Sequence, residues 1–247
     1  MRKLWIIMLV IAVCSCMIFT SSSSAQSKKP IRIGLMYDLT GTYSPMGKDS
    51  QNAATVWQEM INGKGGIQGH PVEFVSLDGQ SDPTKATLVI KRLIEAEKVH
   101  AAAGSNATGV ALASGAVCEE AEMPFVTASS SEIFEYTLKP KWSFRACTAG
   151  WEGVDWGFGS LNLLDPKIKT IGILYQGGAF GKALYDMAVR YAPMRDLKIV
   201  AAEKYDPNGT EFGAQISTIM RANPDAVCVY TADMAGPLAI KQMRKWA

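Results

Sequence analysis

The sequence has little cysteine, little histidine and almost no excess of charge. Its 247 residues include five cysteines and two histidines, and the formal net charge is +2. Cys118, Cys147 and Cys228 are widely spaced and no C-x-x-C pair occurs, so neither a disulfide framework nor a zinc site is expected. Because the basic residues form no stripe and do not alternate with aromatics, nucleic acid is not an expected partner.

Motifs of catalysis are also scarce. No G-x-S-x-G elbow occurs, and His70 and His100 each stand at the start of an expected strand, where a structural histidine is the usual interpretation. Gln176, Gly178 and Gly181 follow an expected strand and open an expected helix, so they form a dinucleotide-binding fingerprint whose first glycine is replaced by glutamine. A tight strand-to-helix turn explains these glycines as well. We therefore expect no enzyme, no catalytic residue, no metal ion and no cofactor.

The N-terminus has the features of an export signal. Arg2 and Lys3 precede an apolar run over residues 4–19, which threonine and serines follow at once. This run is shorter than the roughly 20 apolar residues of a spanning helix, so export is favoured over anchoring. Small residues at the cleavage positions predict a mature periplasmic chain that begins at Gln26. Lipid attachment at Cys16 is the alternative, although its flanking residues match that pattern poorly.

From Ile31 onward, short apolar runs alternate with longer amphipathic segments. This rhythm is typical of parallel sheets covered by helices and predicts the α/β class. The expected strands are 31–37, 72–77, 99–103, 123–127, 170–175, 199–205 and 226–230. The expected helices are one capped by Asp49 or Ser50 and stopped by Gly63, one capped by Asp82, one reaching about Glu122, and those at about 181–194, 212–222 and 235–247.

The rhythm lapses between Ser129 and Thr148, where a proline and several aromatics follow no clear period. We expect a crossing between two lobes there. It divides the chain into a signal peptide (1–25), a first ligand-binding lobe (26–146) and part of a second lobe (147–247). The second lobe has only three expected strands, and its last helix ends without a stop signal. These features indicate a piece of a longer protein.

Polar loops follow several of the expected strands. Ligands of open parallel sheets bind beyond the carboxyl ends of the strands. Ser105 and Thr108 stand directly before a helix, whose free N–H groups and positive dipole end favour a carboxylate, although an ordinary helix cap explains them too. Ser129 to Ser131 follow the neighbouring strand, either as plain loop polarity or as part of the same site.

Aromatic and acidic residues also occur at strand ends and in the loops beyond them. Tyr43, Trp151 and Phe180 stand outside the helical stripes, where they either wall an apolar pocket or pack between loops. Asp78 and Asp233 are the acids at strand ends expected to have a carboxylate free for a ligand ammonium. The sequence leaves the two roles of the aromatics open.

Eight segments, in order and spacing, make the chain resemble a known family, the type I periplasmic binding proteins of branched-chain amino-acid transport. These segments are Ile33-Gly34-Leu35, Thr40-Gly41, Met46-Gly47, the run 61–69, Asp82-Pro83, Pro124-Phe125-Val126, Phe144-Arg145 and the turn 178–182. The resemblance covers nearly all of the chain after the expected signal peptide. It implies two Rossmann-like or flavodoxin-like lobes with parallel sheets, joined by three crossings, of which the second lobe and the returning crossings are incomplete here.

The resemblance also implies a ligand site. Thr108, Ser129 and Ser131 correspond to the groups that hold the carboxylate and amine of the ligand in the first lobe, and Phe180 to the aromatic that covers the ligand from the second. Asp233 falls near another second-lobe contact. The full set of expected ligand-binding residues is Thr108, Ser129, Ser131, Phe180, Asp233, Tyr43 and Ala107.

Two departures from the family pattern limit this transfer. Ser81 and Ala107 stand where leucine-binding members often have a disulfide, and the acid that usually receives the amino group falls beyond Ala247. The function implied is a solute receptor of an ABC uptake system that binds a branched-chain or related amino acid and docks on a membrane permease. A ligand-sensing subunit, or a receptor for an aromatic acid, an amide or urea, is the alternative.

Overall fold

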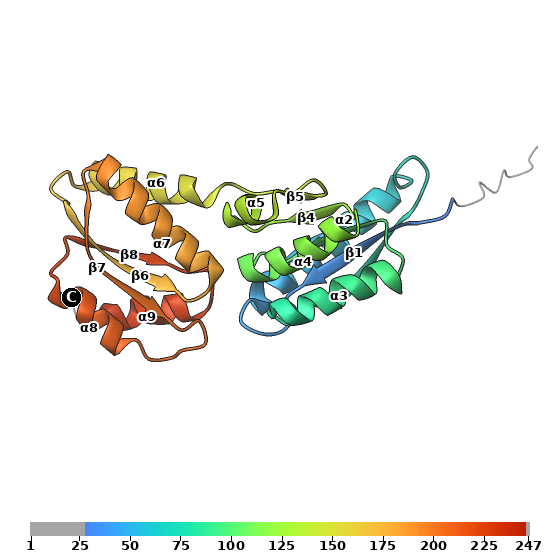
Figure 1. Ribbon diagram of the computed structural model, residues 1–247. Helices are drawn as coiled ribbons and strands as arrows, with labels where there is room; N and C mark the ends of the chain where they lie inside the picture. Colours follow the sequence, from blue (N-terminus) through green and yellow to red (C-terminus); the bar gives the residue numbers. More distant parts are fainter. Residues whose placement is uncertain (1–27, 246–247) are drawn as a thin grey trace, which may run out of the picture.

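The computed structural model describes residues 28–245, so the expected signal peptide and its cleavage before Gln26 lie outside the described residues. Two α/β bodies lie end to end, and the chain passes from one to the other between β5 and α6 (Figure 1). Within residues 28–245, none of the helices combines the length and the hydropathy that a bilayer crossing requires.

The first lobe contains a parallel sheet of five strands in the order β2-β1-β3-β4-β5. The strands are β1 (Ile31–Tyr37), β2 (Val72–Asp78), β3 (Ala101–Gly104), β4 (Phe125–Thr127) and β5 (Ser143–Arg145). The helices are α2 (Ser44–Gly63), α3 (Pro83–Glu95), α4 (Thr108–Glu120) and α5 (Ile133–Leu138). Helices α3 and α4 pack against each other, whereas α2 contacts β1 and β2.

The second lobe contains a parallel sheet of three strands in the order β7-β6-β8. The strands are β6 (Thr170–Gln176), β7 (Lys198–Tyr205) and β8 (Ala226–Tyr230). The helices are α6 (Gly150–Leu164), α7 (Ala179–Tyr191), α8 (Gly213–Arg221) and α9 (Ala235–Met243), with a short 3-10 helix at Ala192–Arg195.

Both faces of the second sheet are buried, as expected for a parallel sheet between helices. Successive residues of β6 point to opposite faces. Ile171 and Ile173 are fully buried in one apolar cluster together with Ala188 of α7. Leu174 is fully buried in another, together with Ile216 of α8. The central strand is therefore fixed from both sides, and its carboxyl end is held rigidly at the cleft.

The seven expected strands are all present, but the expected crossing between Ser129 and Thr148 contains more secondary structure than the sequence predicts. It holds β5, which completes the first sheet, and α5, and it is followed by the unpredicted α6. Three residues are too few for a visible period in β5, and glycines interrupt the stripe of α6. The first helix begins at Ser44 with Pro45 in its first turn, so the cap expected at Asp49 or Ser50 is wrong.

Candidate ligand-binding site

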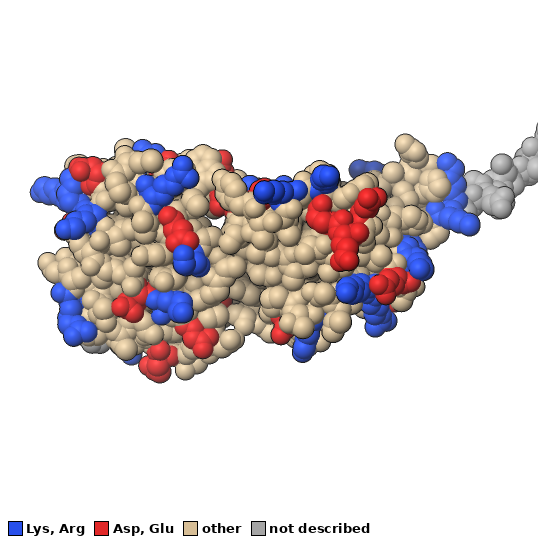
Figure 2. Space-filling model, in the orientation of Figure 1, with Lys and Arg blue, Asp and Glu red and all other residues tan. Residues whose placement is uncertain are grey.

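A cavity lies between the two lobes, at the carboxyl ends of their strands. Its volume is about 260 Å³, and residues of both lobes line it. Those expected from the sequence are Tyr43, Ala107 and Thr108 from the first lobe and Phe180 from the second. None of the described residues that line this cavity carries a charged side chain. On the face shown in Figure 2, charged side chains of both signs are spread over both lobes.

The N-terminus of α4 forms the first-lobe wall of the cavity. Ala107 precedes the helix in an extended conformation and supplies no side-chain cap. Its N–H donates to Ser105 Oγ at 3.0 Å, and Ser105 Oγ donates to Asp38 Oδ2 at 2.6 Å. The N–H groups of the next residues begin the helix without a partner inside it, so within the described part of the chain they are available to a ligand oxygen. This arrangement suits a carboxylate.

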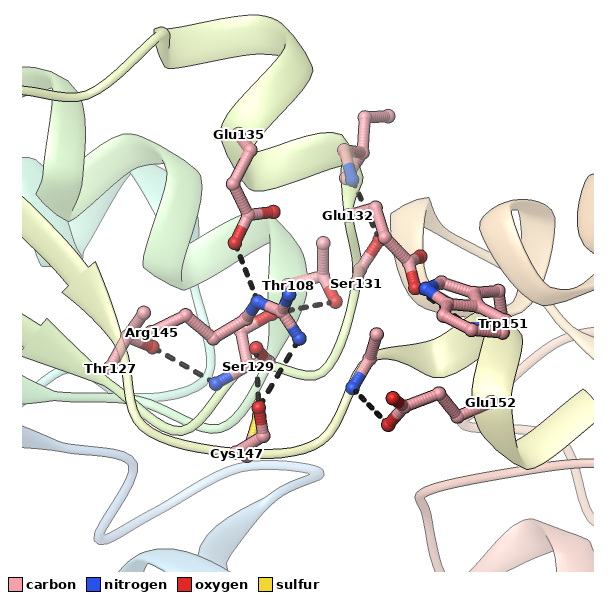
Figure 3. Close-up of polar contacts among 12 residues, drawn as sticks. Thr108, Thr127, Ser129, Ser131, Glu132, Glu135, Arg145, Cys147, Trp151 and Glu152 are labelled. Atoms are coloured by element: carbon pink, nitrogen blue, oxygen red, sulfur yellow. Dashed lines mark hydrogen bonds and ion pairs between the residues drawn. The ribbon is translucent and has the colours of Figure 1, made fainter.

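A chain of buried hydroxyl groups links the ends of β3 and β4 behind this wall (Figure 3). Ser129 Oγ donates to Thr108 Oγ1 at 3.2 Å, and Ser129 N donates to Thr127 Oγ1 at 3.1 Å. Thr127 Oγ1 in turn donates to Ser105 O at 2.7 Å. Thr108 and Ser129, expected to be neighbours, are thus in direct contact. Ser131 is also buried, but its Oγ accepts from Ile133 N at 3.4 Å at the start of α5.

The crossing is tied to the second lobe close to this chain (Figure 3). Gly150 N, at the start of α6, donates to Ser130 O at 2.7 Å, and Trp151 N donates to Glu132 Oε1 at 2.8 Å. The first lobe therefore caps the first helix of the second. Trp151 stacks on Tyr191 with ring centroids 6.0 Å apart, so it packs within the second lobe rather than lining the cavity.

Phe180 is shared by the walls of two cavities. It lines the one described above and a second cavity of about 230 Å³ beside the crossing, where Leu184 and Tyr230 also contribute. The turn around Phe180 needs glycine on both sides: Gly178 has φ +105°, and a Cβ on Gly181 would lie 1.9 Å from the Gln176 carbonyl oxygen. The near-fingerprint in the sequence is therefore a tight strand-to-helix turn that places Phe180 in the cleft.

Gln176 is a cleft residue that the sequence connects only with the fingerprint. It is fully buried, its Nε2 donates to Tyr43 OH at 2.5 Å across the lobes, and its Oε1 accepts from Ala232 N at 2.9 Å. Burial, with a smaller contribution from the nearby Asp233 carboxylate, raises the pKa of Tyr43 above its ordinary value, so the phenol stays protonated at neutral pH. Its proton is then available to a ligand, because the hydroxyl oxygen already accepts from Gln176.

The acids expected to have a free carboxylate are both engaged. Asp233 is buried and accepts from Ala235 N at 2.9 Å, Gly236 N at 3.0 Å and Tyr205 OH at 3.2 Å, so it caps α9. The Asp78 carboxylate accepts hydrogen bonds from the loop after β1 and from its own loop. The expectation of a spare carboxylate at these positions is wrong, because local backbone N–H groups occupy both.

Comparisons with known proteins all find similarity to binding proteins. A family model described as periplasmic binding protein matches residues 30–246. An "Amino acid binding protein" of Pseudomonas aeruginosa is 26% identical over 228 residues, which are 90% of this chain and 59% of that protein. A "Leu/Ile/Val-binding protein homolog 7" of Brucella melitensis is 24% identical over 218 residues, which are 83% of this chain and 53% of that protein. The chain thus spans little more than half the length of these relatives.

Solved structures share the fold. An extracellular ligand-binding receptor from Rhodopseudomonas palustris HaA2 superposes with a TM-score of 0.78 at 25% identity, covering 89% of this chain and 58% of that one. A leucine binding protein from Thermotoga maritima superposes with a TM-score of 0.76 at 23% identity, covering 87% and 60%. The expected α/β class with parallel sheets in two lobes is confirmed.

Proposed function

The chain belongs to the periplasmic binding protein family, and from this premise we propose that it is the solute receptor of an ABC uptake system, with a small carboxylate-bearing ligand held between its lobes. The supporting observation is the open N-terminus of α4, with Thr108 beside it and Phe180 facing it across the cavity. Backbone N–H groups and the helix dipole bind the carboxylate, and Phe180 covers the apolar part of the ligand.

The volume favours a ligand of the size of an amino acid. The two cavities that meet at Phe180 measure about 260 and 230 Å³, and no charged side chain among the described residues lines either. A buried ammonium group needs a paired acid, because an unpaired buried charge is costly. The names of the relatives favour a branched-chain or related amino acid. The second candidate is an aromatic acid, an amide or urea. These ligands carry no ammonium group and so need no acid in the uncharged lining.

The receptor acts outside the cytoplasm in this proposal. The export signal delivers it to the periplasm, ligand enters between open lobes, and the closed form docks on a membrane permease. A ligand-sensing subunit of a regulatory system uses the same binding step with a different partner. Genes for permeases and ATPases beside this one support the uptake receptor, and a neighbouring gene for a signalling protein supports the sensor.

The binding site is tested by removing one hydroxyl from the protein expressed from its complete gene. Thr108 lines the cavity, and Thr108→Val keeps the shape of the side chain but removes the Oγ1 that accepts from Ser129 Oγ. The loss of one charge-assisted hydrogen bond weakens binding about tenfold or more. Thr55→Val on the exposed side of α2 is the matched control. Calorimetry with leucine, benzoate and acetamide measures the dissociation constants, and equal affinities of both variants for any probe that binds contradict the site.

A further inference from the structure

Two direct side-chain hydrogen bonds join the lobes across the mouth of the cleft. Thr42 Oγ1 donates to Asn208 Oδ1 at 2.8 Å, and Gln176 Nε2 donates to Tyr43 OH at 2.5 Å. Thr42, Tyr43 and Asn208 also line the cavity between the lobes. The two bonds are therefore built into the walls of the site, and they exist only while the lobes are close together.

The partners of the inner bond are oriented in advance by their own lobes. The Gln176 amide is fixed by Ala232 N, which donates to Oε1 at 2.9 Å and so directs the NH₂ group at the opposite lobe. Tyr43 N donates to Ser81 Oγ at 3.0 Å, and this contact holds the loop that presents the phenol. Because both groups are positioned without the other lobe, closing the cleft joins them with little further loss of side-chain freedom.

The outer bond joins Thr42, which is half-buried in the loop after β1, to Asn208, which is exposed in the loop after β7. Asn208 N donates to Asp206 Oδ1 at 2.9 Å in a tight turn, which places the Asn208 side chain opposite Thr42. Water competes for this pair when it separates, so its contribution is smaller than that of the inner pair, in which Gln176 is fully buried and Tyr43 partly buried.

We propose that these two bonds, Tyr43 with Gln176 and Thr42 with Asn208, form a latch that holds the lobes closed even without ligand and slows ligand release. The proposal rests on the proposed function, since only a receptor that opens to admit ligand needs a latch. Tyr43 links closure of the lobes to ligand binding, because its ring lines the cavity and its hydroxyl accepts the hydrogen bond from Gln176. Separation of the lobes breaks this bond and moves the second-lobe wall, with Phe180, away from Tyr43.

The latch is tested without any ligand, by a distance between the lobes. Spin labels are attached at Lys85 and Glu211, both exposed and in different lobes, through keto-bearing amino acids that leave the native cysteines unlabelled. Pulsed electron resonance then gives the distance distribution. The double variant Thr42→Val, Tyr43→Phe removes both hydroxyl groups and keeps the side-chain shapes.

Wild type is expected to show one short, narrow distance. A neutral hydrogen bond changes an equilibrium by a factor of about 2 to 10, so the double variant should lower the ratio of closed to open molecules by about tenfold or more and add a longer distance. The matched control Thr55→Val, Tyr136→Phe changes the same residue types at exposed positions and should leave the distribution unchanged.

Two results overturn the latch. One is a double variant with the wild-type distribution, and the other is a wild type that is already open without ligand. Equal urea unfolding midpoints of the two double variants show that any change arises from the cleft rather than from the fold. A failure of leucine, benzoate and acetamide to bind counts against the proposed function instead, because the distance measurement contains no ligand.

Discussion

Asp78 holds the loop that carries Tyr43, and asparagine in its place removes only the charge. The carboxylate accepts hydrogen bonds from Leu39 N at 2.9 Å, Thr40 N at 3.2 Å, Thr40 Oγ1 at 2.7 Å and Gln80 N at 2.8 Å. Burial alone would raise the pKa of Asp78, but the hydrogen bonds from Thr40 and the neighbouring N–H groups outweigh it and hold the pKa below its ordinary value.

The magnitude follows from the kind of bond that is changed. In Asp78→Asn one oxygen still accepts the backbone N–H groups, and the new amide can donate to the Thr40 hydroxyl, so the contacts survive without their charge. A bond to a charged group contributes about 1.5 to 3 kcal/mol, against about 1 kcal/mol for a neutral one. The three backbone N–H groups share the Oδ1 atom of Asp78, and water partly screens its charge. We therefore expect Asp78→Asn to lower the free energy of unfolding by about 1 to 2 kcal/mol at pH 7.

The pH dependence has a definite sign. The folded-state pKa of Asp78 lies below the unfolded value of about 3.9, so its contribution is complete above that value and disappears as the pH falls through the folded-state pKa. Urea unfolding at pH 7, 5, 4 and 3 measures the free energy of unfolding. The gap in this free energy between wild type and Asp78→Asn should be constant down to pH 5 and then narrow. Asp49→Asn, exposed on α2, should show no gap. A gap that is absent at pH 7, or unchanged at pH 3, refutes this reasoning.

Three further predictions concern single positions. Asp233→Asn should lower the free energy of unfolding by about 1 kcal/mol and leave ligand affinity within threefold, because the carboxylate caps α9. Loss of ligand binding in calorimetry would instead show that Asp233 contacts the ligand. Gly181→Ala should cost about 3 kcal/mol or more in urea unfolding, since its Cβ meets the Gln176 carbonyl, whereas Gly153→Ala has open space and should gain up to about 1 kcal/mol. Intact mass of the exported protein should give Gln26 as the first residue, and a diacylglycerol adduct on Cys16 would contradict that.

Local patterns predict the elements of this fold well where they are long. Each of the seven segments expected as strands overlaps a strand, because buried parallel strands are rich in apolar residues, although β3 and β4 are shorter than expected. Strand β5 has three residues and α6 contains Gly153 and Gly157, so neither has a readable period. Their places are set by the sheet edge and by the crossing, which are tertiary features.

The candidate ligand-binding site is likewise only partly predictable from the sequence. Thr108 and Ser129 are predictable neighbours, because they follow β3 and β4, which lie side by side in the sheet. The pairing of Tyr43 with Gln176 joins different lobes, so no spacing in the sequence indicates it. Asp233 is recognisable as an acid at a strand end, but its capture by the N–H groups of α9 depends on a turn geometry that composition does not reveal.

The central claim is that a small carboxylate-bearing ligand binds between the lobes, at the N-terminus of α4. A thermal-shift screen of the protein expressed from its complete gene, against branched-chain amino acids, aromatic acids and short amides, tests it most directly. A ligand at 100 times its dissociation constant adds about 2.7 kcal/mol to the free energy of unfolding, which raises the melting temperature by several degrees. The account predicts such a rise with an acid of one of the first two groups and its reduction in Thr108→Val. No rise with any compound contradicts the account.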